Sequence, residues 1–106
     1  MNKTEVIARR ILGWKLNRWD RWYDFETGEF IYDCDFQPEK NLDHALRIVD
    51  KLEEYGFTYV AKSQCEVYFN DVRGTGSHLA EAITNAAYKV ADNTVIEEEW
   101  MQYQLI

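Results

Sequence analysis

Three of the four tryptophans lie within nine residues near the start of the chain, at Trp14, Trp19 and Trp22. An indole ring is one of the largest apolar groups in proteins, and it is usually packed in a core or used for stacking. A fold that accommodates this stretch must therefore bury some of these rings. Trp14 follows a helix stop and is expected in the core, whereas Trp19 has charged and polar neighbours and is expected to be exposed.

The same stretch is the basic part of an acidic chain. Residues 1–22 carry six Lys/Arg against two Asp/Glu, so this segment is +4, whereas residues 23–106 carry six against seventeen, within a net charge of −7. A conventional nucleic-acid binder needs a basic face that displaces counterions, so we expect no extended nucleic-acid partner. The basic segment suits a small phosphorylated ligand, and the acidic remainder can imitate DNA.

The chain has 106 residues, which is the size of one domain with one core. It contains no apolar run of membrane-spanning length and no signal-peptide core, so a cytoplasmic protein without a membrane partner is expected. Cys34 and Cys65 are far apart and lack metal-ligand spacing. We expect both to be reduced, small core residues.

The first third of the chain predicts a helix and a β-hairpin. Thr4 is a candidate helix N-cap, and Gly13 is a candidate left-handed stop. The apolar stripe between them consists of Val6, Ile7, Ile11 and Leu12. Residues 22–25 and 30–32 are β-prone runs joined by a turn at residues 26–29, which predicts a hairpin.

A second helix is predicted from the Asn41 cap to Gly56. Its expected buried face consists of Leu42, Ala45, Leu46, Val49 and Leu52. Residues 57–62 and 65–72 predict a second hairpin, because Val67 and Phe69 alternate with polar residues. Residues 73–76 predict a turn, and Ser77 is a candidate cap of a third helix.

The third helix has an inward face that includes Ile83 and Ala87. After it, residues 97–99 form an acidic run, and residues 100–106 alternate like a strand. That strand would complete either the chain's own sheet or the sheet of a neighbouring copy. We therefore divide the chain into a domain at residues 1–92 and a tail at residues 93–106. The element order is α-ββ-α-ββ-α with an extra C-terminal strand, which predicts an α/β sandwich.

The chain contains an ordered set of short motifs: Ile7-Ala8 with Gly13-Trp14, Trp22, Asp35-Phe36-Gln37-Pro38, Asn41-Leu42-Asp43-His44-Ala45 with Val49 and Leu52, and residues 79–87. This order gives a resemblance to the phage ABA sandwich domain family, from about residue 7 to residue 91. It implies a small α/β/α sandwich encoded by a phage and made in the cytoplasm of a bacterial host. It brings no established activity and no catalytic residues. Residues 17–21 and the tail after Asp92 depart from the family pattern.

Two candidate ligand-binding sets stand out. The first is a stacking platform for a base, in which aromatic rings are interleaved with guanidinium groups: Arg18, Trp19, Arg21, Trp22 and Tyr23. Against it, Trp22 also suits a core position. The second is an anion site at the start of the third helix, formed by Arg73, Thr75 and Ser77. The alternative is that the same residues form an ordinary turn with a serine cap. We favour this alternative over the anion site.

No constellation of residues predicts catalysis. His44 and His78 lack Cys, Asp or Glu partners at metal-ligand spacing, so we expect no metal site. We likewise expect no cofactor, no catalytic residues and no enzymatic activity.

The leading hypothesis is a non-enzymatic, phage-encoded binding protein that acts against host defence. In one version a homo-oligomer captures a small nucleotide-type immune signal of the host between its subunits. In the alternative version the acidic surface binds and inhibits a host protein, in the manner of a DNA mimic. A structural or accessory role in the phage is the third hypothesis.

Overall fold

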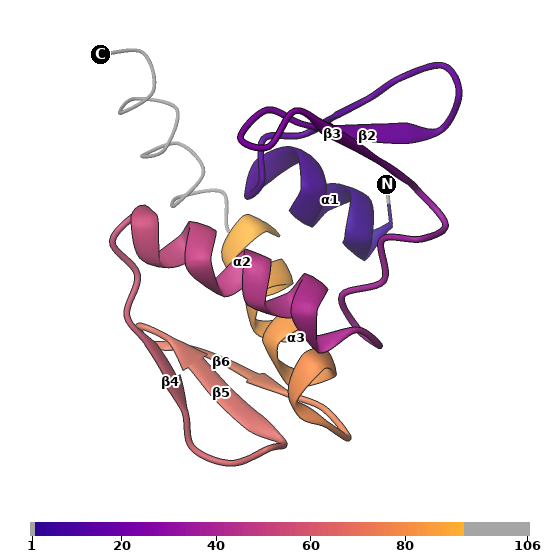
Figure 1. Ribbon diagram of the computed structural model, residues 1–106. Helices are drawn as coiled ribbons and strands as arrows, with labels where there is room; N and C mark the ends of the chain where they lie inside the picture. Colours follow the sequence, from indigo (N-terminus) through magenta and orange to yellow (C-terminus); the bar gives the residue numbers. More distant parts are fainter. Residues whose placement is uncertain (1, 93–106) are drawn as a thin grey trace.

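The computed structural model describes residues 2–92, which form three helices and two antiparallel sheets (Figure 1). The helices are α1 (Lys3–Arg10), α2 (Leu42–Glu54) and α3 (Leu79–Asp92). The first sheet contains β1 (Lys15–Leu16), β2 (Arg21–Asp24) and β3 (Glu29–Tyr32), and the second contains β4 (Tyr59–Ala61), β5 (Glu66–Phe69) and β6 (Val72–Thr75).

The hairpin predicted at residues 22–32 is confirmed as β2 and β3. Trp22 pairs with Ile31 and Tyr23 pairs with Phe30. The turn between the strands uses Gly28, which has a φ of 73°. The sheet has a third strand that the sequence did not predict, because β1 is only two residues long and pairs Leu16 with Trp22.

The second hairpin is confirmed as β4 and β5, but the prediction of a turn at residues 73–76 is wrong. Val72–Thr75 is strand β6, and it pairs with β5. The reversal occurs earlier, at Asn70, whose φ of 54° is left-handed. Gly74 is needed for close packing rather than for turning. A Cβ atom at Gly74 would lie 2.4 Å from the Cβ of Ala86 on α3.

The helix starts differ from two of the three predicted caps. Asn41 caps α2 as expected, because its side chain accepts the N–H of His44 at 3.2 Å. Asn2, not Thr4, caps α1 by accepting the N–H of Glu5 at 2.8 Å. Ser77 does not cap α3. The carboxylate of Glu81 accepts the N–H of Ser77 instead, at 2.9 Å.

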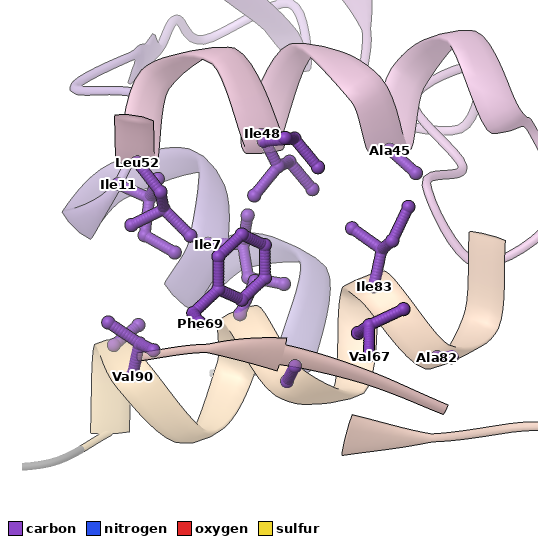
Figure 2. Close-up of a cluster of buried hydrophobic side chains, with 14 of the residues drawn as sticks. Ile7, Ile11, Ala45, Ile48, Leu52, Val67, Phe69, Ala82, Ile83 and Val90 are labelled. Carbon is purple, nitrogen blue, oxygen red and sulfur yellow. The ribbon is translucent and has the colours of Figure 1, made fainter. Parts of the chain in front are cut away.

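The main core lies where the three helices meet β5, as Figure 2 shows. Val67 and Phe69 point from β5 toward Ile48 and Leu52 of α2 and toward Ile83 of α3. The predicted burial of Val49, Ile83 and Ala87 is confirmed.

The prediction that Leu46 is buried is wrong, because 39% of it is exposed. Leu42, on the same predicted face, is 43% exposed. The buried side of α2 is rotated toward Ala45, Ile48, Val49 and Leu52. Positions 45, 46, 48 and 49 are all apolar, so the sequence is compatible with two different buried faces of this helix. Tertiary packing selects one of them.

A smaller cluster joins the first sheet to α1. Ala8, Trp14, Trp22 and Phe36 are buried together in it. The opposite side of α1 contributes Ile7 and Ile11 to the main core, so α1 lies between the first sheet and the other helices (Figure 1). On the other side, α3 packs against β5 and β6. The small α/β fold is thus confirmed, whereas the exact element order and the α/β/α layering expected from the sequence are not.

The expected burial of the two cysteines is wrong, because Cys34 and Cys65 are both exposed free thiols. Cys65 precedes β5 and lies in the turn, where its N–H donates to Ser63 Oγ at 3.1 Å. The strand predicted at residues 100–106 and the whole proposed tail lie outside the described residues. None of the helices within residues 2–92 combines the length and the apolar character that crossing a membrane requires.

Candidate functional site

The outer face of the first sheet carries exposed aromatic rings. Successive residues of a strand point to opposite faces of the sheet, so Trp22 and Asp24 of β2 point inward and are buried. Tyr23 points outward, and its partner across the hairpin is Phe30. Tyr32 lies on the same face, two residues further along β3 than Phe30. The alternation therefore gathers rings from both strands on one surface.

These rings contact one another and remain open to solvent. The rings of Tyr23 and Phe30 have centroids 4.9 Å apart, and Phe25 meets Tyr23 edge-on at 4.7 Å. Phe25 is nevertheless 57% exposed and Phe30 is 55% exposed. With Tyr32 and the loop residue Trp19, which is 61% exposed, they form what we call the aromatic surface.

Cations accompany the exposed rings. The guanidinium carbon of Arg18 lies 4.5 Å from the ring centroid of Trp19, and that of Arg21 lies 4.8 Å from the centroid of Tyr32. Both distances are within the range of a cation–π contact. Lys15 is the β1 partner of Tyr23 and so faces the same side of the sheet. Each of these cations is positioned beside a ring that a planar ligand can stack on.

The loop between β1 and β2 holds Trp19 at the surface. The side-chain oxygen of Asn17 accepts the N–H of Trp19 at 2.9 Å and the N–H of Arg21 at 3.1 Å. Asp20 closes the loop in a left-handed conformation with a φ of 60°. Its carbonyl accepts the N–H of Asp33 at 2.8 Å. The loop is therefore tied to the sheet by hydrogen bonds at both ends.

Trp22 belongs to the core and not to the aromatic surface. It is fully buried, and its indole N–H donates to Asp33 Oδ1 at 2.8 Å. The guanidinium carbon of Arg9 lies 5.2 Å from its ring centroid. A ring in this position has no free face for a ligand. Of the predicted stacking set, Arg18, Trp19, Arg21 and Tyr23 remain accessible.

The three residues of the predicted anion site lie on or beside the second sheet. Arg73 is on β6, where its Nε donates to Glu66 on β5. This pairing raises the pKa of Arg73 and lowers the pKa of Glu66. The carbonyl of Thr75 accepts from Asn85 at 2.7 Å. The Ser77 N–H is used by the carboxylate of Glu81, so an anionic group of the chain itself already occupies this helix start.

The structure thus places the predicted ligand-binding residues in two separate regions. Arg21 and Tyr23 are on the first sheet and Arg18 and Trp19 are in its β1–β2 loop, whereas Arg73, Thr75 and Ser77 are beside α3. Sequence reasoning did not include Phe25, Phe30 and Tyr32. The signal that identifies them is the hairpin register, since Tyr23 and Phe25 alternate on one strand and Phe30 and Tyr32 alternate on the other.

In the described part of the chain, the titratable and metal-ligating side chains do not form a metal site. Within residues 2–92, no three His, Cys, Asp or Glu side chains are grouped so as to hold a metal ion. The Nδ1 atom of His44 accepts the N–H of Gln37 at 3.1 Å, and burial lowers the pKa of His44. This histidine supports the loop that carries Phe36.

Within residues 2–92, fold and surface together define a small α/β protein with two three-stranded antiparallel sheets, three helices and an aromatic, basic face. The family model of the phage ABA sandwich domain matches residues 5–88, and the chain belongs to that family. No curated protein and no solved structure matches the chain. Family membership supports a phage protein of unassigned activity.

Proposed function

We propose that this chain is a non-enzymatic binding protein whose ligand is of the nucleotide type, and that it binds this ligand through the aromatic surface. The observation that supports the proposal most is the exposure of Trp19, Phe25 and Phe30. Contiguous exposed apolar patches rimmed by polar residues mark interaction sites and ligand-binding surfaces.

The chemistry of the surface favours a planar, anionic ligand. A base stacked on an aromatic side chain gains about 1–3 kcal/mol, and the gain is tolerant of base identity. Arg18 and Arg21 lie against Trp19 and Tyr32, so a phosphate can be bound while the ring takes the base. The face is a sheet surface, which suits a ligand that is covered from the other side by a second subunit.

Membership of a phage family gives this binding a biological use. We propose that the protein is made in the cytoplasm of the bacterial host and withholds a nucleotide signal of host immunity. A homo-oligomer serves this purpose best, because a second copy would enclose a ligand that one flat face leaves exposed. A monomer by light scattering at micromolar concentrations would remove the oligomer from the proposal but not the binding surface.

Calorimetry with a panel of cyclic and linear nucleotides tests the proposal. Tyr32→Ala removes a ring that lies under Arg21, and we expect it to weaken binding by about 1–3 kcal/mol. Tyr68→Ala is the matched control, because Tyr68 lies under Lys62 on the second sheet. It should leave the affinity unchanged. If every nucleotide binds more weakly than about 1 mM, the small-ligand function is wrong.

The second candidate function is inhibition of a host protein by the acidic surface. The observation that favours it is the charge, because residues 23–106 carry seventeen Asp/Glu against six Lys/Arg. Pull-down from host lysate at low and high salt tests it. A captured DNA-binding enzyme that is released by salt would support this function, and capture that is insensitive to salt would contradict it.

A further inference from the structure

A cleft of about 180 Å³ lies on the inner side of the first sheet, away from the aromatic surface. Its walls come from three segments: the chain after α1, the turn between β2 and β3, and α2. Leu12 and Trp14 supply apolar lining, and Asp24 lines it from β2. Because Asp24 and Tyr23 are neighbours on one strand, they point to opposite faces of the sheet. The cleft is therefore separate from the surface of the proposed function.

The ionisable groups of the cleft do not fully neutralise one another. Lys51 forms ion pairs with Glu26 and with Glu54, which accounts for two of the four carboxylates in the lining. The other two are Asp24 and Asp50. Arg47 is the second cation. Neither Asp50 nor Arg47 forms an ion pair with any residue of the described part of the chain. The lining as a whole is net negative by two charges.

Asp24 is the unusual member of this set. It is only 8% exposed, and its Oδ1 accepts the N–H of Glu26 at 2.9 Å. Within residues 2–92 no group donates to Oδ2. Oδ2 is still reached by solvent, because within residues 2–92 no buried side-chain oxygen lacks a hydrogen-bond partner. The remaining acceptor of Asp24 is therefore available to a donor that enters the cleft.

We propose that this cleft binds an organic cation, namely a guanidinium or primary ammonium group on a short alkyl stem. The N–H groups of the cation donate to Asp24 Oδ2 and to Asp50, and the stem packs against Leu12 and Trp14. Carboxylates are the strongest acceptors for such donors. The cleft has the volume of about six water molecules in the liquid, which is the size of a guanidinium with a few methylenes.

The net charge of the lining decides between a cation and an anion. Arg47 and Lys51 would attract an anion, but Lys51 is already held between two carboxylates. An anion would also face Asp24 and Asp50 at close range, which is repulsive. A cation meets the carboxylates of Asp24 and Asp50 and the guanidinium of Arg47, which forms no ion pair within residues 2–92. The ligand can come from two sources, a free polyamine-like metabolite or an arginine side chain of another protein.

NMR titration of the full chain tests the proposal, with the indole N–H of Trp14 as the reporter. Agmatine represents the free cation, and a blocked arginine amide represents the protein side chain. We expect saturable shifts with a Kd near about 1 mM for at least one of them. Agmatine alone binding identifies a free metabolite as the ligand type, and the blocked arginine alone binding identifies a protein side chain. Both outcomes support the proposal that the cleft binds an organic cation.

Asp50→Asn should weaken this binding about tenfold or more, because it removes a charged acceptor. Asp50 is exposed, so the substitution leaves the core intact. Asp43→Asn is the matched control, since Asp43 is on the same helix and does not line the cleft. Equal weakening by both variants would mean general attraction to an acidic protein and would overturn the proposal. So would the absence of any saturable shift with either compound.

Discussion

The first and second sheets have the same number of strands and the same antiparallel pairing, but they differ in what their outer faces carry. On the second sheet, Glu66 accepts from both Arg73 and Tyr68, and Lys62 lies over the Tyr68 ring. Apart from Val60, this face is covered by polar groups that bond to one another.

On the first sheet the cations lie over rings and not against carboxylates. Phe25 and Phe30 stay more than half exposed. Both sheets bury their inner faces equally well, through Trp22 in one and Phe69 in the other. The first sheet thus keeps an exposed aromatic surface on its outer face. Such a surface is what a binding protein presents to its ligand.

The largest expected effect is a difference in the free energy of unfolding between two alanine variants, one at a phenylalanine of each sheet. Phe69→Ala should lower the free energy of unfolding by about 3–5 kcal/mol, because Phe69 is fully buried in the main core. Phe30→Ala should lower it by about 1 kcal/mol or less, because that ring is largely exposed and loses only its cross-strand contact with Tyr23. Urea denaturation of both variants measures the pair. Similar losses in the two would mean that the aromatic surface is part of the fold.

The second prediction concerns the close packing of β6 on α3. Gly74→Ala should destabilise the protein by about 1–3 kcal/mol, since the new methyl group would lie 2.5 Å from the carbonyl oxygen of Ala82. Thr75→Ala, at the next residue of β6 and exposed, serves as the control. Thermal denaturation compares the two. A neutral Gly74→Ala would show that the second sheet packs less tightly on its helix than described.

The third prediction separates the two regions by their ligand binding. Trp19→Ala should weaken nucleotide binding by about 1–3 kcal/mol and leave the melting temperature unchanged, because the ring is exposed. Arg73→Ala should leave the affinity unchanged, because Arg73 is on the second sheet and is paired with Glu66. Calorimetry on both variants decides this. A loss of binding only in Arg73→Ala would move the site to the second sheet.

The smallest expected effect is a difference in acid sensitivity. The pKa of His44 is lowered below 6.5, first because burial penalises the imidazolium, so its contribution to stability is present above pH 6.5 and is lost as the pH falls through the lowered pKa. The pKa of Glu66 is lowered below 4.5 by its bond from Arg73, so that pair persists until more acidic conditions.

Stability should therefore fall slightly between about pH 7 and pH 5, through loosening of the Phe36 loop beside the first sheet. His44→Gln should remove this dependence, as measured by urea midpoints at the two pH values. A dependence that persists in the variant would assign it to another group.

An element of this fold can be predicted from the sequence when its hydrophobic pattern is long enough to recognise. The α2 and α3 helices and both hairpins follow from periodicity and turn residues, and α2 also follows from its Asn41 cap. The third strand of each sheet does not. Lys15–Leu16 is too short to show alternation, and Val72–Thr75 contains a glycine that suggests a turn until its contact with Ala86 is known. The rotation of α2 that exposes Leu46 depends on tertiary packing, which no local pattern encodes.

The candidate site was predictable in part for the same reason. The exposure of Trp19 and the burial of Trp14 follow from their neighbours in sequence. The burial of Trp22 depends on the alternation of β2, and the inclusion of Phe30 and Tyr32 depends on the register with β3. The separation of Arg73 from this surface is set by the fold as a whole. The distance in space between segments that are far apart in the chain cannot be predicted from this sequence alone.

The proposed ligand-binding surface is the outer face of the first sheet and not that of the second. NMR chemical-shift mapping during titration with a nucleotide of the panel tests this assignment. We expect shifts at the Trp19 indole and at the amides of Arg21, Tyr23 and Tyr32, with β4, β5 and β6 unchanged. Shifts confined to the second sheet, or no shifts with any nucleotide of the panel, would contradict it.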